Sequence, residues 1–119
     1  VTGHIHSYER NLPIKSGKVA SFQVMPNDKK YNYIVNPSAP VHVTQGAAGQ
    51  YGEWSDPPAS YKVKSYNVKR DITYSYLSVR SANSTHMLVE SFKSKNNALN
   101  DFFYIIKSTE SKYANLPYY

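Results

Sequence analysis

Three strand-like segments close the chain, and they constrain its fold more than any other feature of the sequence. Residues 74–80 alternate, with Leu77 and Val79 on one face and polar side chains on the other. Residues 85–93 and 102–108 follow, and the stretches between the three segments are polar and rich in turn-forming Ser and Asn. The pattern predicts an antiparallel meander of three strands.

The last of these segments carries a second constraint. Residues 102–106, with the sequence FFYII, are apolar on both faces. A strand of this kind needs cover on each side, so we expect it in a central or sandwiched position rather than at an open edge. Residues 19–24 and 40–44 are also strand-like, whereas residues 27–40 resemble a polar loop and residues 51–71 give no clear pattern.

Composition excludes several classes of protein. The 119 residues have room for one domain, and no apolar run approaches the roughly 20 residues needed to cross a bilayer, so we expect no membrane partner. The 14 Lys and Arg residues are scattered, so the net charge of +6 predicts a solvated basic surface and not a nucleic-acid partner. Because the chain has no Cys, any metal must be bound by His, carboxylate, amide or phenolate groups.

The candidate chemistry lies in residues 3–10, which have the sequence GHIHSYER. His4 and His6 are separated by one residue, so an extended backbone would direct both imidazoles to the same face. There they would reach one metal ion together or two ions about 3.5 Å apart. A His-x-His pair alone leaves two interpretations open, metal binding and ordinary loop or surface histidines.

The full string resembles the last metal-binding motif of the purple acid phosphatases, Gly-His-(Val/Ile)-His-x-Tyr-Glu-Arg, and matches all six of its fixed positions. The strand and Gly-rich turn at residues 40–49 and the closing strands are also similar to this family, most of all to its fungal-type secreted acid phosphatases. The resemblance spans residues 2–107. It implies the carboxy-terminal half of an α/β (α+β) metallophosphatase β-sandwich, mainly β here, with a domain part over residues 1–108 and a tail over residues 109–119.

The resemblance also implies roles for individual residues. His4 would ligate the divalent ion and His6 the ferric ion of a dinuclear centre, Fe(III) plus Zn, Mn or Fe(II), which hydrolyses phosphate monoesters via a metal-bound hydroxide. Glu9 and Arg10 would support this loop without touching the metal, and Tyr8 would pack rather than act as a tyrosinate ligand.

The ligands that the resemblance leaves unassigned lie upstream of the motif in this family. A missing amino-terminal catalytic half, from the same parent protein or from another chain, would therefore complete the site. We expect the 119 residues alone to be inactive. The alternative is a catalytically inert structural or interaction module that retains this part of the fold.

Other conspicuous residues have structural interpretations. His42 is expected to be buried and hydrogen-bonded in its strand, and His86 to be exposed. The glycines of residues 46–52 do not have P-loop spacing, so a tight turn near the site is expected rather than a phosphate cradle. Trp54 would either wall the substrate pocket or pack in the core.

Asn83 begins a glycosylation sequon, Asn83-Ser84-Thr85. Together with the family resemblance, the sequon indicates a secreted or a lysosomal or vacuolar glycoprotein.

Overall fold

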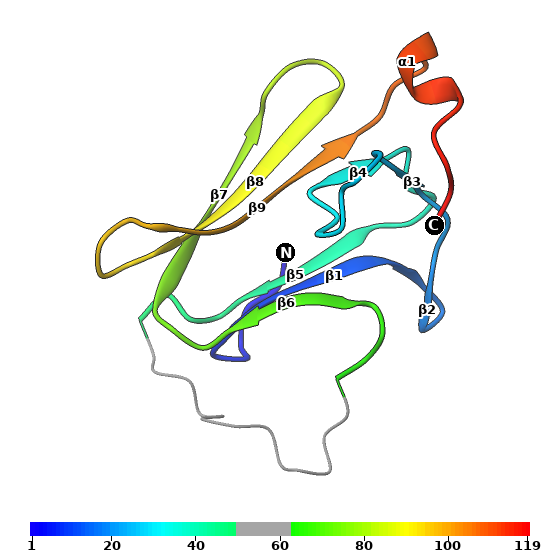
Figure 1. Ribbon diagram of the computed structural model, residues 1–119. Helices are drawn as coiled ribbons and strands as arrows, with labels where there is room; N and C mark the ends of the chain where they lie inside the picture. Colours follow the sequence, from blue (N-terminus) through cyan, green and yellow to red (C-terminus); the bar gives the residue numbers. More distant parts are fainter. Residues whose placement is uncertain (50–62) are drawn as a thin grey trace.

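The computed structural model describes residues 1–49 and 63–119, which form two β-sheets packed face to face (Figure 1). The first sheet contains β1 (Tyr8–Lys15), β2 (Lys18–Val19), β5 (Val41–Gln45) and β6 (Asn67–Asp71). The second contains β3 (Gln23–Val24), β4 (Tyr33–Val35), β7 (Ser75–Ser81), β8 (His86–Lys93) and β9 (Leu99–Ile106). A short helix, α1 (Ser111–Ala114), follows β9, and no helix in the described part has the length and hydrophobicity to cross a bilayer.

The second sheet contains the predicted meander. Its strands run in the order β3-β4-β9-β8-β7; β7, β8 and β9 pair antiparallel, and β4 pairs with β9 in parallel. β9 is therefore central, as its two apolar faces predicted. Phe103 lies in the core between the sheets, whereas Ile106 on the other face packs beneath α1. The expectation of a mainly β chain with antiparallel closing strands is confirmed.

The first sheet is built around β1, which pairs antiparallel with β5 along one edge and with β6 along the other. The sequence did not predict β1, β4 or β6. The apparent strand at residues 19–24 is divided between β2 and β3, which belong to different sheets, because the chain crosses from one sheet to the other at residues 20–22.

The core between the sheets is formed by side chains from both. It consists of Tyr8, Leu12, Phe22, Ile34, Val43, Val89 and Phe103, all at most 4% exposed. Full burial of an aliphatic or aromatic side chain of this size contributes about 1.5–3 kcal/mol, so these residues supply the main driving force for joining the two layers.

A buried ion pair crosses this core. Arg10 of β1 is 1% exposed, and its guanidinium donates to both carboxylate oxygens of Asp101 on β9, Nε to Oδ2 at 2.7 Å and Nη2 to Oδ1 at 3.0 Å. Arg10 also donates to the carbonyls of Tyr31 and Lys30, at 2.8 and 3.3 Å. The Tyr8 hydroxyl donates to Asp101 Oδ2 at 2.6 Å, so the pair joins the two sheets and the loop before β4.

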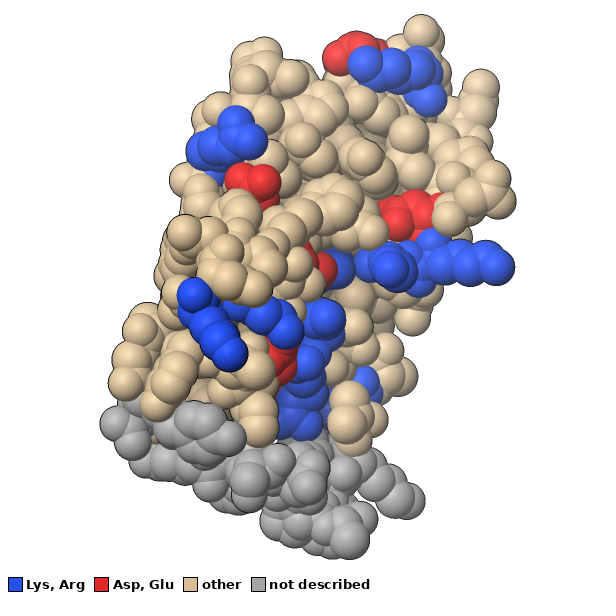
Figure 2. Space-filling view, turned by 60° about the vertical axis from the view of Figure 1, so that its left-hand side comes forward, with Lys and Arg blue, Asp and Glu red and all other residues tan. Residues whose placement is uncertain are grey.

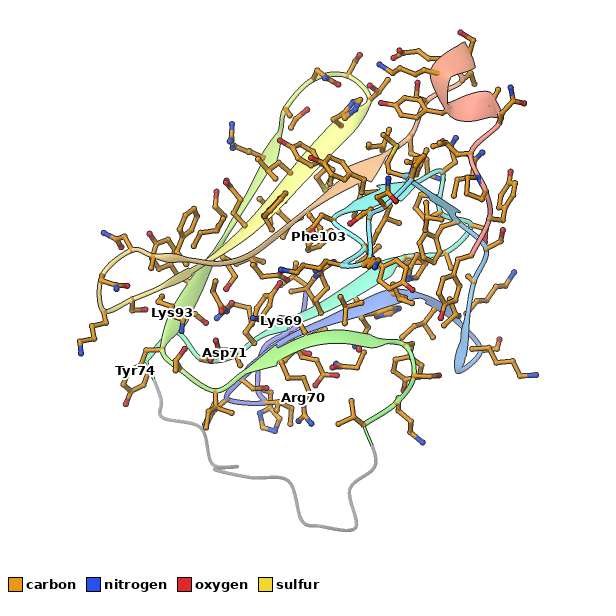
Figure 3. The ribbon with its side chains drawn as sticks, in the orientation of Figure 1. Lys69, Arg70, Asp71, Tyr74, Lys93 and Phe103 are labelled. Atoms are coloured by element: carbon orange, nitrogen blue, oxygen red, sulfur yellow. The ribbon has the colours of Figure 1, made fainter. Side chains whose placement is uncertain are left out.

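A second charged contact links the sheets at the ends of β6 and β8. Lys93 Nζ lies 4.0 Å from Asp71 Oδ2, and Asp71 Oδ1 accepts hydrogen bonds from the amide and the hydroxyl of Thr73, at 2.8 and 2.6 Å. Burial alone would raise the pKa of Asp71, but the Thr73 hydrogen bonds and the positive charges of Lys93 and Lys69 outweigh it, so the pKa lies below its usual value. Figure 3 shows Asp71 and Lys93 facing each other between the sheets.

The carboxy-terminal tail docks on the second sheet. Tyr113 of α1 is buried against Val35 and Ile106. Farther along, the Tyr119 amide donates to the Phe22 carbonyl at 2.9 Å, and the two rings stack with centroids 5.1 Å apart. These contacts fix the tail to the rest of the fold.

We predict that Arg10→Met lowers the free energy of unfolding by about 3–5 kcal/mol, because Asp101 would stay buried without its cation. Chemical denaturation monitored by tyrosine fluorescence measures this change. Arg70→Met is the matched control, since the Arg70–Glu9 pair on the other face of β1 is partly exposed and its loss should cost about 1 kcal/mol or less. Equal decreases in the free energy of unfolding of the two variants would show that the buried pair does not hold the sheets together.

We predict a pH-dependent effect for Asp71→Asn, which keeps a hydrogen-bond acceptor for Thr73 and removes the charge. The folded-state pKa lies below the unfolded value of about 3.9, so the carboxylate stabilises the fold above that pH and loses this effect as the pH falls through the folded pKa. Thermal unfolding should therefore show a lower Tm for the variant at pH 7 and a shrinking difference below about pH 4. A difference independent of pH would contradict the assignment.

Candidate functional site

The motif loop, defined as residues 3–7, lies between the edge of β5 and the first residue of β1. On its amino-terminal side, Thr2 forms a parallel bridge with Thr44: the Thr2 amide donates to the Val43 carbonyl at 2.9 Å and the Gln45 amide to the Thr2 carbonyl at 2.8 Å. On the other side, β1 begins at Tyr8. Both ends of the loop are therefore fixed to the first sheet.

The expectation of an extended backbone through the two histidines is wrong. The amide of Ile5 donates to the carbonyl of Gly3 at 2.9 Å, and the amide of Ser7 donates to the carbonyl of Ile5 at 2.7 Å, so the chain makes two successive tight turns. Strand alternation thus does not determine the directions of the two imidazoles.

His4 and His6 lie at the surface of the protein. His4 is exposed and has a φ of 71°, in the left-handed region that few residues other than glycine adopt and in which His is enriched. His6 is half-buried. The loop can therefore present both rings to a group outside the first sheet.

Gly46 holds the motif loop against the end of β5. Its amide donates to the Ser7 carbonyl at 3.0 Å, and an added Cβ would lie 2.6 Å from the carbonyl carbon of Ile5 and closer still to its oxygen. Only glycine permits this approach. Gly46 thus lies beside the motif as expected, and its amide is bonded to Ser7 rather than available to a phosphate; Gly52 and Trp54 are outside the described residues.

Buried polar atoms lie in the motif loop and beside it on β5. Ser7 Oγ and Gln45 Oε1 have no hydrogen-bond partner among the residues that the structure describes, although Gln45 Nε2 donates to the Ser75 carbonyl at 2.9 Å. Buried polar atoms without partners are rare in folded proteins.

Glu9 and Arg10 extend from opposite faces of β1. Glu9 lies on the outer face, where its Oε2 is 3.3 Å from Nε of Arg70 on β6, and Figure 3 shows Arg70 on the side of β6 that faces away from the second sheet. Arg10 points into the core and is bound to Asp101. Each side chain thus fixes the strand that follows the two histidines.

Tyr8 is fully buried in the core cluster. Its burial, followed by its hydrogen bond to Asp101 and the negative charge of that residue, raises the pKa of the phenol strongly, so Tyr8 stays neutral. It is a packing residue and hydrogen-bond donor, not a phenolate metal ligand.

The other two histidines differ from expectation. His42 is exposed, because alternation along β5 places the neighbouring Val43 inside. His86 is half-buried rather than exposed, because the tail packs beside it: Nδ1 lies 2.7 Å from Thr85 Oγ1 and Nε2 lies 3.1 Å from the Tyr113 hydroxyl. The surroundings of His86 thus depend on a distant part of the chain, whereas those of His42 follow from the alternation of its own strand.

Asn83 lies exposed in the turn between β7 and β8. Its Oδ1 accepts hydrogen bonds from the amides of Thr85 and His86, at 2.9 and 3.0 Å. These bonds fix the turn and place the sequon at the surface.

Metal ligation needs more than this loop provides. Within residues 1–49 and 63–119, no three His, Cys, Asp or Glu side chains are grouped as a site for a metal ion. Two imidazoles can form part of a metal site, but a dinuclear centre needs further ligands.

We predict that Gly46→Ala displaces the motif loop, because its Cβ would collide with the Ile5 carbonyl. The heteronuclear NMR signals of His4, His6 and Ser7 should shift, and the Tm should fall. Gly49→Ala is the matched control, since apart from its chain neighbours no atom of the described residues lies within 4 Å of its added Cβ. Unchanged histidine signals in the Gly46 variant would show that the contact does not position the loop.

The chain was compared with known proteins. A family model described as iron/zinc purple acid phosphatase-like protein C matches residues 39–102, which lie outside the motif loop. The structure of purple acid phosphatase PPD1 from yellow lupin (Lupinus luteus) seeds is similar, with a TM-score of 0.71 and 25% identity. That similarity covers 90% of this chain but 17% of the lupin chain, and a search of curated proteins gave no significant match. Because the family model matches more than half of its residues, the chain belongs to the purple acid phosphatase-like protein C family.

Proposed function

We propose that the chain is the carboxy-terminal part of a dinuclear-metal acid phosphatase that hydrolyses phosphate monoesters, and that it contributes His4 and His6 as metal ligands. The observation that carries this proposal is the complete GHIHSYER string, with both histidines on a surface loop, in a chain that belongs to the purple acid phosphatase-like protein C family. His4 also has an uncommon left-handed backbone, a feature that clusters at functional sites.

The donor set suits the proposed metals. Neutral imidazole nitrogens bind iron, zinc and manganese, so His4 would hold the divalent ion (Zn, Mn or Fe(II)) and His6 the Fe(III). A metal pair supplies charge that clamps the phosphate and activates water near neutral pH. Glu9 and Arg10 would keep the loop in place through Arg70 and Asp101.

The remaining ligands would come from a catalytic half outside this chain. Two observations support a neighbour beside the motif loop. Among the described residues, Thr2 alone pairs with the outer edge of β5, and backbone groups along such an edge can pair with a strand of another segment. The buried Ser7 Oγ and Gln45 Oε1 are also available to a group that would lie against the loop.

A catalytically inert structural or interaction module is the second candidate. The observation that favours it is that three residues of the motif stabilise the fold. Tyr8 and Arg10 bind Asp101 in the core, and Glu9 pairs with Arg70. Those three residues would be needed for the fold even without catalysis.

The remaining features are proposed together. The domain part would span residues 1–108 and the tail residues 109–119. Asn83, exposed in its turn, would carry a glycan, and the protein would be secreted or lysosomal or vacuolar, without a membrane or nucleic-acid partner. The closer similarity to fungal-type members stays a prediction.

We predict that His6→Ala removes iron from the protein and lowers its hydrolysis of p-nitrophenyl phosphate, and that His4→Ala lowers the content of the second metal. Loss of a direct ligand should exceed the about 10- to 100-fold effect of losing a residue that only supports a ligand. Metal content is measured by mass spectrometry on the protein together with any chain that co-purifies.

His42→Ala is the matched control, because His42 is an exposed histidine on the neighbouring strand β5. It should change neither metal content nor activity. Unchanged metal in the His4 and His6 variants, with unchanged Tm, would overturn the ligand assignment and favour the inert module.

A further inference from the structure

A cleft of about 560 Å³ opens between β6 of the first sheet and β9 of the second. It is lined by residues from 29–32, 65–69 and 99–102 and by Tyr119. Its volume falls within the range of about 300–1,000 Å³ typical of sites for small ligands. None of the motif loop residues lines it.

The charge of the cleft is set by three lysines. Arg10 and Asp101 at its inner side neutralise each other through two hydrogen bonds. Lys29, Lys30 and Lys69 remain, and among the described residues no carboxylate lies within 4.0 Å of their ammonium groups. The cleft thus carries an uncompensated positive charge.

Lys69 is the most informative of the three. It pairs with Arg10 in the register of β1 and β6, so its side chain leaves the inner face of the sheet, and Figure 3 shows it on the side of β6 that faces the second sheet. Lys69 is half-buried, so its aliphatic stem packs in the cleft while its ammonium group stays accessible to a ligand. The nearest carboxylate on its own face of β6, Asp71, is already engaged by Thr73 and Lys93.

The surface around the molecule favours the approach of anions. Figure 2 shows more Lys and Arg than Asp and Glu side chains on the face it displays, and the net charge of the chain is +6. A positive field of this kind concentrates anions near the surface and speeds their encounter with a cleft.

We propose that the cleft between β6 and β9 binds a small polyanion with two or more phosphate groups, held by Lys29, Lys30 and Lys69. Ammonium groups bind phosphate as point charges, and three around one cleft match a ligand with several negative charges better than a monovalent anion. Inorganic polyphosphates and organic bisphosphates share this chemistry.

Calorimetric titration of the protein with pyrophosphate tests the proposal. A chelator is present throughout, so that no metal at His4 or His6 can bind the anion. We expect Lys69→Glu to raise the Kd for pyrophosphate at least tenfold, and Lys30→Glu, a change in an exposed loop residue, to act in the same direction without affecting Tm.

Lys18→Glu is the matched control. Lys18 is an exposed lysine of β2 outside the cleft, and its replacement changes the net charge by the same amount as the two cleft variants. The Kd of the Lys18→Glu variant for pyrophosphate should stay within twofold of the value for the unchanged protein. A second titration with fructose 1,6-bisphosphate distinguishes organic bisphosphates from inorganic polyphosphates. A lower Kd for fructose 1,6-bisphosphate than for pyrophosphate indicates an organic ligand, and a higher Kd indicates an inorganic one.

Two outcomes overturn the proposal. If neither anion binds at low salt, the cleft has no such ligand. If Lys69→Glu, Lys30→Glu and Lys18→Glu weaken binding equally, the affinity reflects net charge alone, and the inward Lys69 instead protects the edge strand β6 from pairing with another sheet.

Discussion

The buried pair of Arg10 and Asp101 is the constraint on which the rest of the structure depends. It joins the central strands of the two sheets, and every guanidinium nitrogen donates a hydrogen bond. These hydrogen bonds matter because an arginine and an aspartate that are withdrawn from water each lose several kcal/mol of hydration free energy. Only an ion pair with well-aligned hydrogen bonds offsets that loss. Arg10 also donates to the carbonyl of Tyr31, which has a φ of 52°, so the pair is linked to the loop before β4 as well.

The same pair explains how one short motif can serve both fold and function. Residues 3–7 form a loop at the surface, whereas Tyr8 and Arg10 directly after it lie in the core. A loop held by a strand that is anchored on both faces keeps its side chains in place better than a free segment. Glu9 anchors the outer face through Arg70, and Gly46 closes the loop from the other side. His4 and His6 thus lie on a loop that leads directly into a strand anchored on both faces.

The sequence predicted those elements whose signals are local. The meander of β7, β8 and β9 could be predicted because its strand-like segments are short and are separated by polar turns in the sequence. The central position of β9 followed from its two apolar faces. β1 was not predicted, because Arg10 breaks its apolar pattern and the partner that permits its burial is 91 residues away. β6, with the sequence NVKRD, is half-buried throughout and has no alternation to detect. The sequence names His4 and His6 as candidate ligands, but the turns around them depend on backbone bonds and on Gly46, which no local pattern reveals.

The neutrality of the Arg10–Asp101 pair also determines the character of the cleft beside it. If Asp101 lacked its partner, a carboxylate at the inner side of the cleft would repel an anion and attract Lys69, which shares a face with Arg10. Because Arg10 takes up both carboxylate oxygens, Asp101 is not available to Lys69, and the nearest carboxylate on that face of β6, Asp71, is engaged by Thr73 and Lys93. One interaction therefore stabilises the sandwich, supports the strand behind the two histidines, and leaves a positive charge directed into the space between the sheets.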